Sequence, residues 1–398
     1  MTAFVPCSAP TWRDPFGMYA ALRDRDPVHY VSDGGYFVLS RFDDIRAAVT
    51  DTETFSSAHG LTFAQTGGED DIIATFAPIV MTDPPAHTAF RRLVSRGFTP
   101  RHVTELEQPV RTFVRDRLAR IADAGGTADI AVELFKPLPS MVVAYYLGVP
   151  EADRPRFDDW TDSIVGATAA GEPERAMGAT VEMAEYFTGL IDYRRAHPGD
   201  DTVSHLVAAA EAGDAGADHE VTPLQVLGFA FTMVTGGNDT STGLLGGTCE
   251  LLTANPEARR ELAANPTLIP DAVEEFLRLT SPVQCLARTT TRDVTIGGTT
   301  IPDGTRVLML YGSGNRDERE FGPTAGELDI RRRPTQILTF SNGAHFCLGA
   351  AAARLMGRIA IEELLAAFPD FAVDADNGVF ADGHYIRRYE SLPFSGKP

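Results

Sequence analysis

The sequence has 398 residues, 43% of them hydrophobic, and a formal net charge of −20 at pH 7. An acidic surface repels nucleic acid and anionic membranes, so we expect neither as a partner. Four scattered cysteines form no disulfide framework and the N-terminus lacks a signal-peptide pattern, which together predict a soluble cytoplasmic protein.

The early part of the chain predicts mixed structure, and helix dominates from about Pro85 onward. A short helix is expected over residues 18–26, and two strands are expected on either side of a turn at Gly34–Gly35. Further along, apolar residues at helical spacing predict helices that end at Gly125, Gly148 and Pro198.

The longest predicted helix covers residues 223–254, with Thr222 as its N-cap. It is apolar almost all round, which indicates a helix that crosses the interior. The Gly236–Gly237 pair weakens its middle by about 1 kcal/mol per glycine relative to alanine. Glycines alone would favour close helix packing, but Asp239 and Thr240 beside them place an acid and an alcohol in a buried helix, which indicates a proton-delivery device.

Two further pairs are weak signals when each is taken singly. Glu275 and Arg278 are three residues apart, so they face each other on a helix, and the ordinary alternative is a surface salt bridge. His87 and Arg91 are four apart and could grip a carboxylate together, and the ordinary alternative is a solvated helix face.

The stretch FSNGAHFCLG holds a lone cysteine just before a long alanine-rich helix. A lone cysteine is usually a small buried hydrophobe. Here Gly343 permits a tight turn and Gly349 permits close approach of the backbone. Amides at the start of the helix are expected to point at the Cys347 sulfur and to lower the pKa of the thiol. A thiolate with such donors and a flat, glycine-lined approach suits a haem iron.

Together these residues resemble a family, the soluble bacterial cytochromes P-450, which are haem-thiolate monooxygenases. The resemblance runs from about Trp12 to Phe394. The family's cysteine signature, F-x-x-G-x-[HR]-x-C-x-G, is met in full by Phe340, Gly343, His345, Cys347 and Gly349. Its helix signature is met by Gly236, Gly237, Asp239, Thr240 and Ser241, and its E-x-x-R motif by Glu275 and Arg278.

The segments TMVTGGNDT, LRLTSPVQ and LARTTTRDVTIG resemble family one hundred and thirty, an actinobacterial group. The chain departs from many relatives at Ile337, where they carry a histidine that contributes to one haem propionate.

The resemblance implies a mainly α fold with a smaller β-rich lobe, the triangular prism of the cytochromes P-450, formed by residues 1–398 as a single catalytic domain. It implies haem b, with Cys347 as the axial iron ligand and Gly236 against the ring. The haem propionates would be held by His87, Arg91, Arg288 and His345. A structural cluster would join Glu275, Arg278 and Arg332, with Arg331 and Arg333 as close competitors for the third place.

If Gly236 and Thr240 face the haem, helical spacing places Phe229, Thr232 and Met233 on the same face. The loop after Pro282 adds further apolar residues, Val283 and Leu286. The sequence therefore predicts a mostly apolar pocket for a small organic substrate, with residues 59–71 and 166–178 as lids.

The resemblance further implies electrons from a ferredoxin and its reductase. Since ferredoxins are commonly acidic, a local basic patch is expected on the cysteine side, at Arg354, Arg358, Arg331 and Arg333; the ordinary alternative is that these arginines solvate helix ends. Two other functions remain open: a haem-thiolate catalyst that does not insert oxygen, or a haem-based gas or redox sensor.

Overall fold

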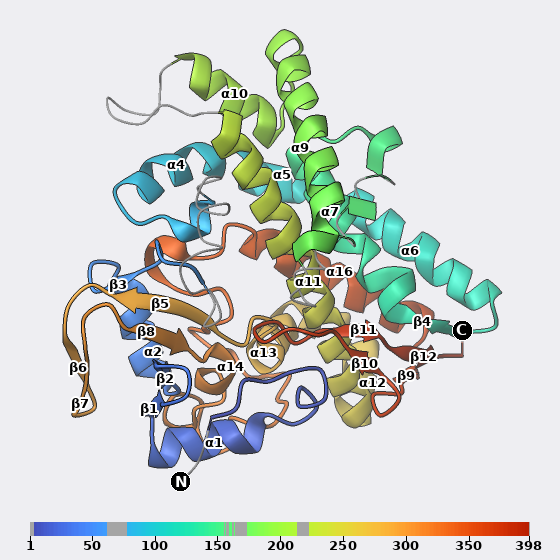
Figure 1. Ribbon diagram of the computed structural model, residues 1–398. Coiled ribbons are helices and arrows are strands. Elements are labelled where there is room, and N and C mark those ends of the chain that lie inside the picture. Colours follow the sequence, from blue (N-terminus) through green and yellow to red (C-terminus); the bar gives the residue numbers. More distant parts are fainter. Residues whose placement is uncertain are drawn as a thin grey trace.

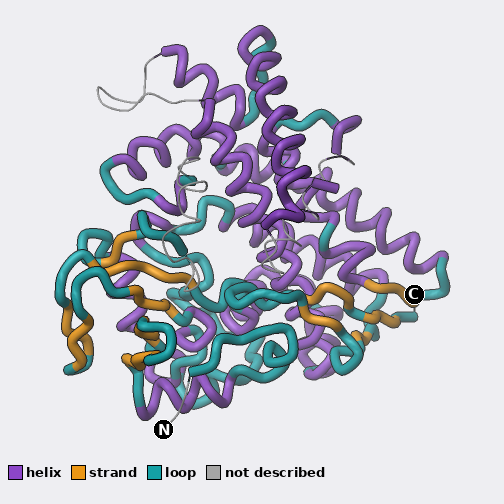
Figure 2. The backbone as a smooth tube through the Cα atoms, in the orientation of Figure 1, coloured by secondary structure: helices purple, strands orange, loops and turns teal. Residues whose placement is uncertain are grey.

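The computed structural model describes residues 4–61, 78–154, 156, 159–160, 163, 173–212 and 223–397. Helices form most of the molecule, and the strands gather in smaller sheets near two of its edges (Figure 1, Figure 2). The expected mainly α fold with a smaller β-rich part is therefore confirmed. Among the described residues no helix is both long and apolar enough to cross a membrane.

The α-helices, in chain order, are α1 (Phe16–Arg25), α2 (Phe42–Thr50), α4 (Ala86–Val94), α5 (Pro100–Glu105), α6 (Glu107–Asp123), α7 (Pro137–Leu147), α9 (Pro173–Ala196), α10 (Thr202–Ala212), α11 (Pro223–Ala254), α12 (Pro256–Ala264), α13 (Ile269–Thr280), α14 (Tyr311–Gly314), α15 (Glu318–Phe321) and α16 (Ala350–Ala367). Short helical turns are η1 (Ile79–Met81), η2 (Ser95–Gly97), η4 (Glu151–Asp153), η5 (Pro266–Leu268), η6 (Gly343–His345) and the π-type turn η3 (Ala131–Phe135).

The strands are β1 (Val28–Val31), β2 (Tyr36–Leu39), β3 (Phe55–Ser56), β4 (Thr127–Asp129), β5 (Leu286–Thr290), β6 (Val294–Ile296), β7 (Thr299–Ile301), β8 (Arg306–Met309), β9 (Ala372–Val373), β10 (Val379–Phe380), β11 (Tyr389–Ser391) and β12 (Pro393–Ser395). The largest sheet has the order β1-β2-β8-β5-β3. Only β2 and β8 run parallel in it, with Phe37 opposite Val307, and the other neighbours are antiparallel.

The elements predicted from the sequence appear where they were expected. α11 covers residues 223–254, and α7 ends at Gly148, whose φ of +74° is the left-handed conformation that glycine adopts at low cost. The two early strands flank Gly34–Gly35. Thr222, the expected N-cap of α11, lies outside the described residues.

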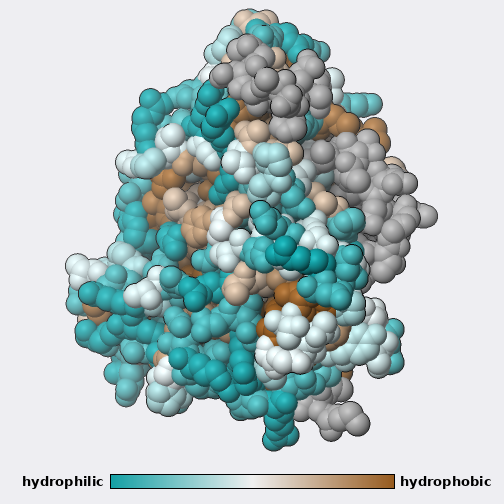
Figure 3. All heavy atoms as spheres, turned by 90° about the vertical axis from the view of Figure 1, so that its left-hand side faces the viewer, coloured by the Kyte–Doolittle hydropathy of each residue, from teal (hydrophilic) through white to brown (hydrophobic). Residues whose placement is uncertain are grey.

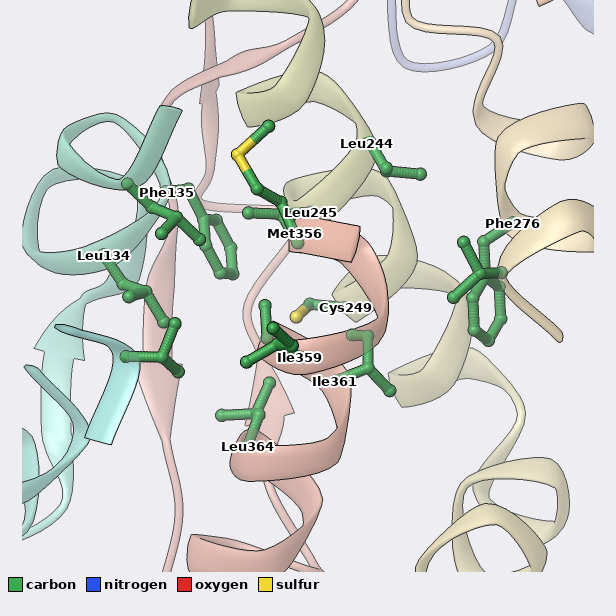
Figure 4. Packing of buried hydrophobic residues seen from close by; sticks show 14 of the residues in the cluster. Leu134, Phe135, Leu244, Leu245, Cys249, Phe276, Met356, Ile359, Ile361 and Leu364 are labelled. Carbon is green, nitrogen blue, oxygen red and sulfur yellow. The ribbon is translucent and has the colours of Figure 1, made fainter. Parts of the chain in front are cut away.

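The largest hydrophobic core surrounds α16. Ile359, Ile361 and Leu364 of this helix lie among side chains of α11, α13 and η3, including Cys249 and Phe135 (Figure 4). Because side chains in such a core are close-packed, the N-terminal end of α16 has little freedom to move relative to α11. This matters because Cys347 lies just before that end.

Ion pairs add a second attachment between α16 and α6. Glu363 of α16 is 10% exposed at its side chain and accepts hydrogen bonds from Arg111 and Arg115 of α6. Burial alone would raise the pKa of Glu363, but the hydrogen bonds from these two arginines outweigh it, so the pKa lies below its ordinary value.

On the face turned to the viewer in Figure 3 the surface is mostly hydrophilic, and apolar atoms appear in recesses between polar side chains.

Candidate active site

A large cavity lies between α11 and the segment that carries Cys347. It contains about 1550 Å³ of space free of protein atoms, including the part open to solvent. Its walls are predominantly apolar.

Most of the residues singled out from the sequence line this cavity: His87, Arg91, Phe229, Thr232, Met233, Gly236, Thr240, Val283, Leu286, Arg288, Phe340, His345, Cys347 and Gly349. The other residues do not line the cavity. Gly343 shapes the cysteine loop, and Asp239 lies on the side of α11 that faces away from the cavity. Glu275, Arg278 and Arg332 form a separate cluster.

The cysteine loop is held by its own backbone. The Cys347 amide donates to the Phe340 carbonyl at 2.8 Å, which closes the loop. Gly343 has a φ of +69°, and a Cβ on it would lie 3.2 Å from the Thr50 Cα. Both the backbone conformation and the close contact therefore require glycine at this position.

The pKa of the Cys347 thiol differs from the expectation. Burial raises it, and the Gly349 amide together with the charges of Arg91 and Arg354 only partly opposes that effect. The predicted lowering by helix-start amides is therefore wrong for the cysteine alone, because loss of water around the sulfur outweighs them. Binding to a metal ion deprotonates a coordinating thiol outright, so a thiolate at Cys347 would form as a metal ion binds rather than before it.

Two arginines bring positive charge to the cavity. Arg288 is 3% exposed, and its guanidinium donates a hydrogen bond to the Ala287 carbonyl at 2.8 Å. Within the described ranges neither Arg288 nor Arg91 has a carboxylate partner. A buried cation without a counter-charge is costly, so these two side chains are suited to an anionic ligand.

Two histidines lie beside these arginines. The ring centroids of His87 and His345 are 4.2 Å apart, and the His87 Nδ1 atom is buried without a hydrogen-bond partner in the described part of the chain. Burial, reinforced by the nearby arginines, lowers the pKa of His87 to about 4 and that of His345 to about 3. The expected cationic grip of His87 and Arg91 therefore consists of a neutral imidazole that can donate a hydrogen bond and an arginine that carries the charge.

These features fit haem b. The cavity has a cysteine sulfur on one wall and two uncompensated arginines for the carboxylates of the propionates. Around a Cβ built on Gly236 or on Gly349, no described atom lies within 4 Å, so a flat ring can approach the backbone from both sides of the cavity.

The turn of α11 that faces the cavity contains Thr240. Its Oγ1 atom donates to the Gly236 carbonyl at 2.8 Å, so the hydroxyl is held inside the helix groove while it lines the cavity. Asp239 points to the other side, where its Oδ1 atom lies 2.7 Å from Arg388 Nε. Burial raises the pKa of Asp239, and Arg388 only partly counteracts this.

Sequence reasoning missed Arg388 as a partner of Asp239. The two are far apart in the chain, and the RRYE segment carries no motif.

Glu275, Arg278 and Arg332 meet in one buried cluster. Arg278 makes two hydrogen bonds of 2.7 Å to the Glu275 carboxylate, and both side chains are fully buried. Arg332 Nε donates to the same carboxylate at 3.2 Å. The competitors have other partners, Glu261 for Arg331 and Asp271 for Arg333. The cluster thus contains the three residues named from the sequence.

The apolar side of the cavity also has walls that sequence reasoning missed. Val142, Val143 and Tyr146 of α7 line it, together with Phe98, whose ring stacks on Tyr146 at 4.4 Å between centroids. Only the packing of α7 on α11 places them there. The predicted lid over 59–71 lies mostly outside the described residues, and so does the first part of the one over 166–178.

The arginines expected to form a basic patch are each paired with an acid. Arg354 binds Glu274, and Arg358 binds Glu107 and Glu362. The patch is therefore partly neutralised.

Comparisons with known proteins agree with this site. A family model described as Cytochrome P450 matches residues 30–371. Cytochrome P450 130 of Mycobacterium tuberculosis is 57% identical over 98% of this chain and 97% of its own length. Vitamin D(3) 25-hydroxylase of Pseudonocardia autotrophica is 36% identical over 97% of this chain and 95% of its own length. The solved structure of the bacillaene polyketide synthase cytochrome P450 PksS of Bacillus subtilis 168 is 30% identical, with a TM-score of 0.88 and complete coverage of both chains.

Proposed function

The chain belongs to the cytochrome P450 family, and on that premise we propose that it inserts one oxygen atom of O2 into, or dealkylates, a mostly apolar small organic molecule. As a family member it is a monooxygenase that carries haem b. The observation that carries the proposal is the shared cavity, in which the Cys347 sulfur and the Thr240 hydroxyl both lie on the walls.

When bound, the haem would supply dioxygen activation, and a cysteine thiolate bound to its iron would favour cleavage of the O–O bond. Cys347 is the residue that would hold the iron. Arg91, Arg288, His87 and His345 would hold the propionates by charge and by hydrogen bonds. Thr240 would hold a proton at its Oγ1 atom, and Asp239 would supply protons from behind the helix.

We propose an apolar substrate because of the cavity walls. Phe229, Met233, Val283 and Leu286 present hydrocarbon to it, and Thr232 has its hydroxyl bonded to the Gly228 carbonyl at 2.7 Å. Apolar walls exclude water and favour ligands that bury apolar area. A relative named for hydroxylation of vitamin D(3) is consistent with this class.

Electrons would come from a ferredoxin and its reductase. The patch around Arg354 and Arg358 is the proposed docking surface, even though acids neutralise part of it, because it lies on the α16 side, beside Cys347. We further propose that residues 1–398 act as one catalytic domain, in the cytoplasm, where the four described cysteines would stay reduced, as they are free here.

The proposal is tested with the purified holoprotein, a surrogate ferredoxin system and a panel of azoles and apolar aromatics. Ligands that displace iron-bound water should shift the spin state, and oxygen should be consumed with product formation. The reduced protein should give the thiolate-type carbon monoxide spectrum, and Cys347→His should lose it.

Oxygen consumption without any oxygenated product across the panel would favour a non-inserting catalyst. A carbon monoxide spectrum without oxygen consumption would favour a sensor. Tight binding of small dicarboxylates with no apolar ligand found would contradict the apolar pocket.

A further inference from the structure

Asp239 belongs to a chain of charges that leads from the helix interior to solvent. Arg388 is 4% exposed at its side chain and lies between two acids. Its Nε atom is 2.7 Å from Asp239, and its NH1 atom bonds to Glu390. The Glu390 carboxylate in turn pairs with Lys136, at the start of α7.

The two ends of this chain have different environments. The side chain of Asp239 is 15% exposed and that of Glu390 is 46% exposed. Lys136 is one of only two lysines in the whole sequence. An arginine stays charged at any working pH, so Arg388 cannot pass a proton on and instead divides one positive charge between two acids.

We propose that Glu390 and Lys136 are positioning residues that control how firmly Arg388 holds Asp239. This inference rests on the proposed role of Asp239 in proton delivery. Asp239 must leave Arg388 to turn towards Thr240. Glu390 attracts the same guanidinium and so weakens the ion pair between Arg388 and Asp239. Lys136 opposes this pull, because it occupies the Glu390 carboxylate from the outer side.

The charged and titratable groups around Asp239 determine whether each substitution raises or lowers the pKa of Asp239. Arg388 and Lys136 lower the pKa of Asp239, and Glu390 raises it. Tyr385, from the loop before Arg388, also interacts with Asp239. Replacing Glu390 by Gln should therefore lower the Asp239 pKa and strengthen its ion pair, and replacing Lys136 by Met should do the opposite.

The test compares Glu390→Gln, Lys136→Met and a control, Glu250→Gln. Glu250 lies on the same helix α11 and pairs with Arg387, the neighbour of Arg388, at 3.0 Å, so it matches the removed charge without touching Arg388. The first readout is an NMR titration of carboxyl-labelled aspartate in the reduced, carbon-monoxide-bound holoprotein, with Asp239→Asn identifying the resonance. The Asp239 titration should move to lower pH in Glu390→Gln, to higher pH in Lys136→Met, and stay in place in Glu250→Gln.

The second readout is oxygen consumption against pH with a surrogate ferredoxin system. In Glu390→Gln the acid limb of the pH profile should move to lower pH, and coupled turnover should fall about twofold or more, which corresponds to about 0.4 kcal/mol or more. Turnover driven by hydrogen peroxide should be unchanged, since peroxide brings its own protons. Shifts in the same direction for both variants, or equal shifts in Glu250→Gln, would overturn the proposal. If the protein does not oxygenate at all, the NMR titration still decides the question, so the two failures are distinguishable.

Discussion

The two adjacent glycines of α11 should respond in opposite ways to the same added methyl group. A Cβ on Gly236 meets no described atom within 4 Å, whereas a Cβ on Gly237 would lie 2.8 Å from Val143 Cγ2 of α7. In a helix interior alanine is better than glycine by about 0.8–1 kcal/mol. Gly236→Ala should therefore stabilise the protein by up to about 1 kcal/mol.

Gly237→Ala gains the same helix propensity but overpacks the contact with α7. Overpacking of a well-packed site costs about 1–3 kcal/mol, and valine is stiff at χ1, so it cannot turn away freely. The net result should be a loss of up to about 2 kcal/mol, which is a fall in Tm of about 2–3 °C, because the entropy of unfolding is roughly 0.8 kcal/mol/K for a chain of this length.

The assay is thermal and urea unfolding of the haem-free proteins, since the haem would lie against Gly236 in the holoproteins, with haem affinity measured in parallel. A second change, Val143→Ala, should relieve Gly237→Ala but not improve Gly236→Ala. The reasoning is refuted if Gly236→Ala destabilises as much as Gly237→Ala, or if Val143→Ala gives no relief. Because the Gly236 methyl group would project into the cavity, Gly236→Ala should also weaken the binding of a bulky azole while sparing a small one.

Thr240→Ala should bind haem and ligands normally but divert electrons to peroxide, with coupled turnover lower by about 10²–10⁴, as measured by the ratio of peroxide to product. Glu275→Ala should give haem-free or insoluble protein, because the arginines it pairs with lose their counter-charge at a cost of about 3–5 kcal/mol; well-folded holoprotein would contradict this. Replacing Arg91 and Arg288 together by Gln should speed haem transfer to apomyoglobin about tenfold or more, since charged hydrogen bonds contribute about 1.5–3 kcal/mol each. Glu363→Gln should flatten the acid side of the stability curve: the lowered pKa of Glu363 stabilises the fold above the unfolded value of about 4.3, and this contribution is lost as pH falls through the folded value, so urea unfolding of parent and variant should converge in acid.

Local signals explain what the sequence predicted well. The bounds of α11 follow from a predominantly apolar segment that starts at Pro223 and stops before Asn255–Pro256. The turn before Cys347 follows from Gly343, whose positive φ only glycine adopts cheaply. The order of the motifs along the chain, more than the hydrophobic periodicity, then indicated that α11 and the cysteine loop belong to one site.

Contacts between distant segments could not be read in this way. The pairing of Asp239 with Arg388, and the stacking of Tyr146 on Phe98, depend on how helices and strands cross. The raised pKa of Cys347 depends on how completely the loop is buried, which residue types do not reveal.

The positive charge of Arg288 also bears on how the protein is made. The chain carries a large negative excess overall, yet it buries this cation with no acid beside it in the described structure. As proposed above, the propionates of the haem would bring the missing negative charge, so the cofactor would complete the electrostatic balance of the fold. Since a ligand that binds only the folded state stabilises it in proportion to the logarithm of its concentration, the supply of haem in the cell sets how much of this polypeptide survives as folded protein.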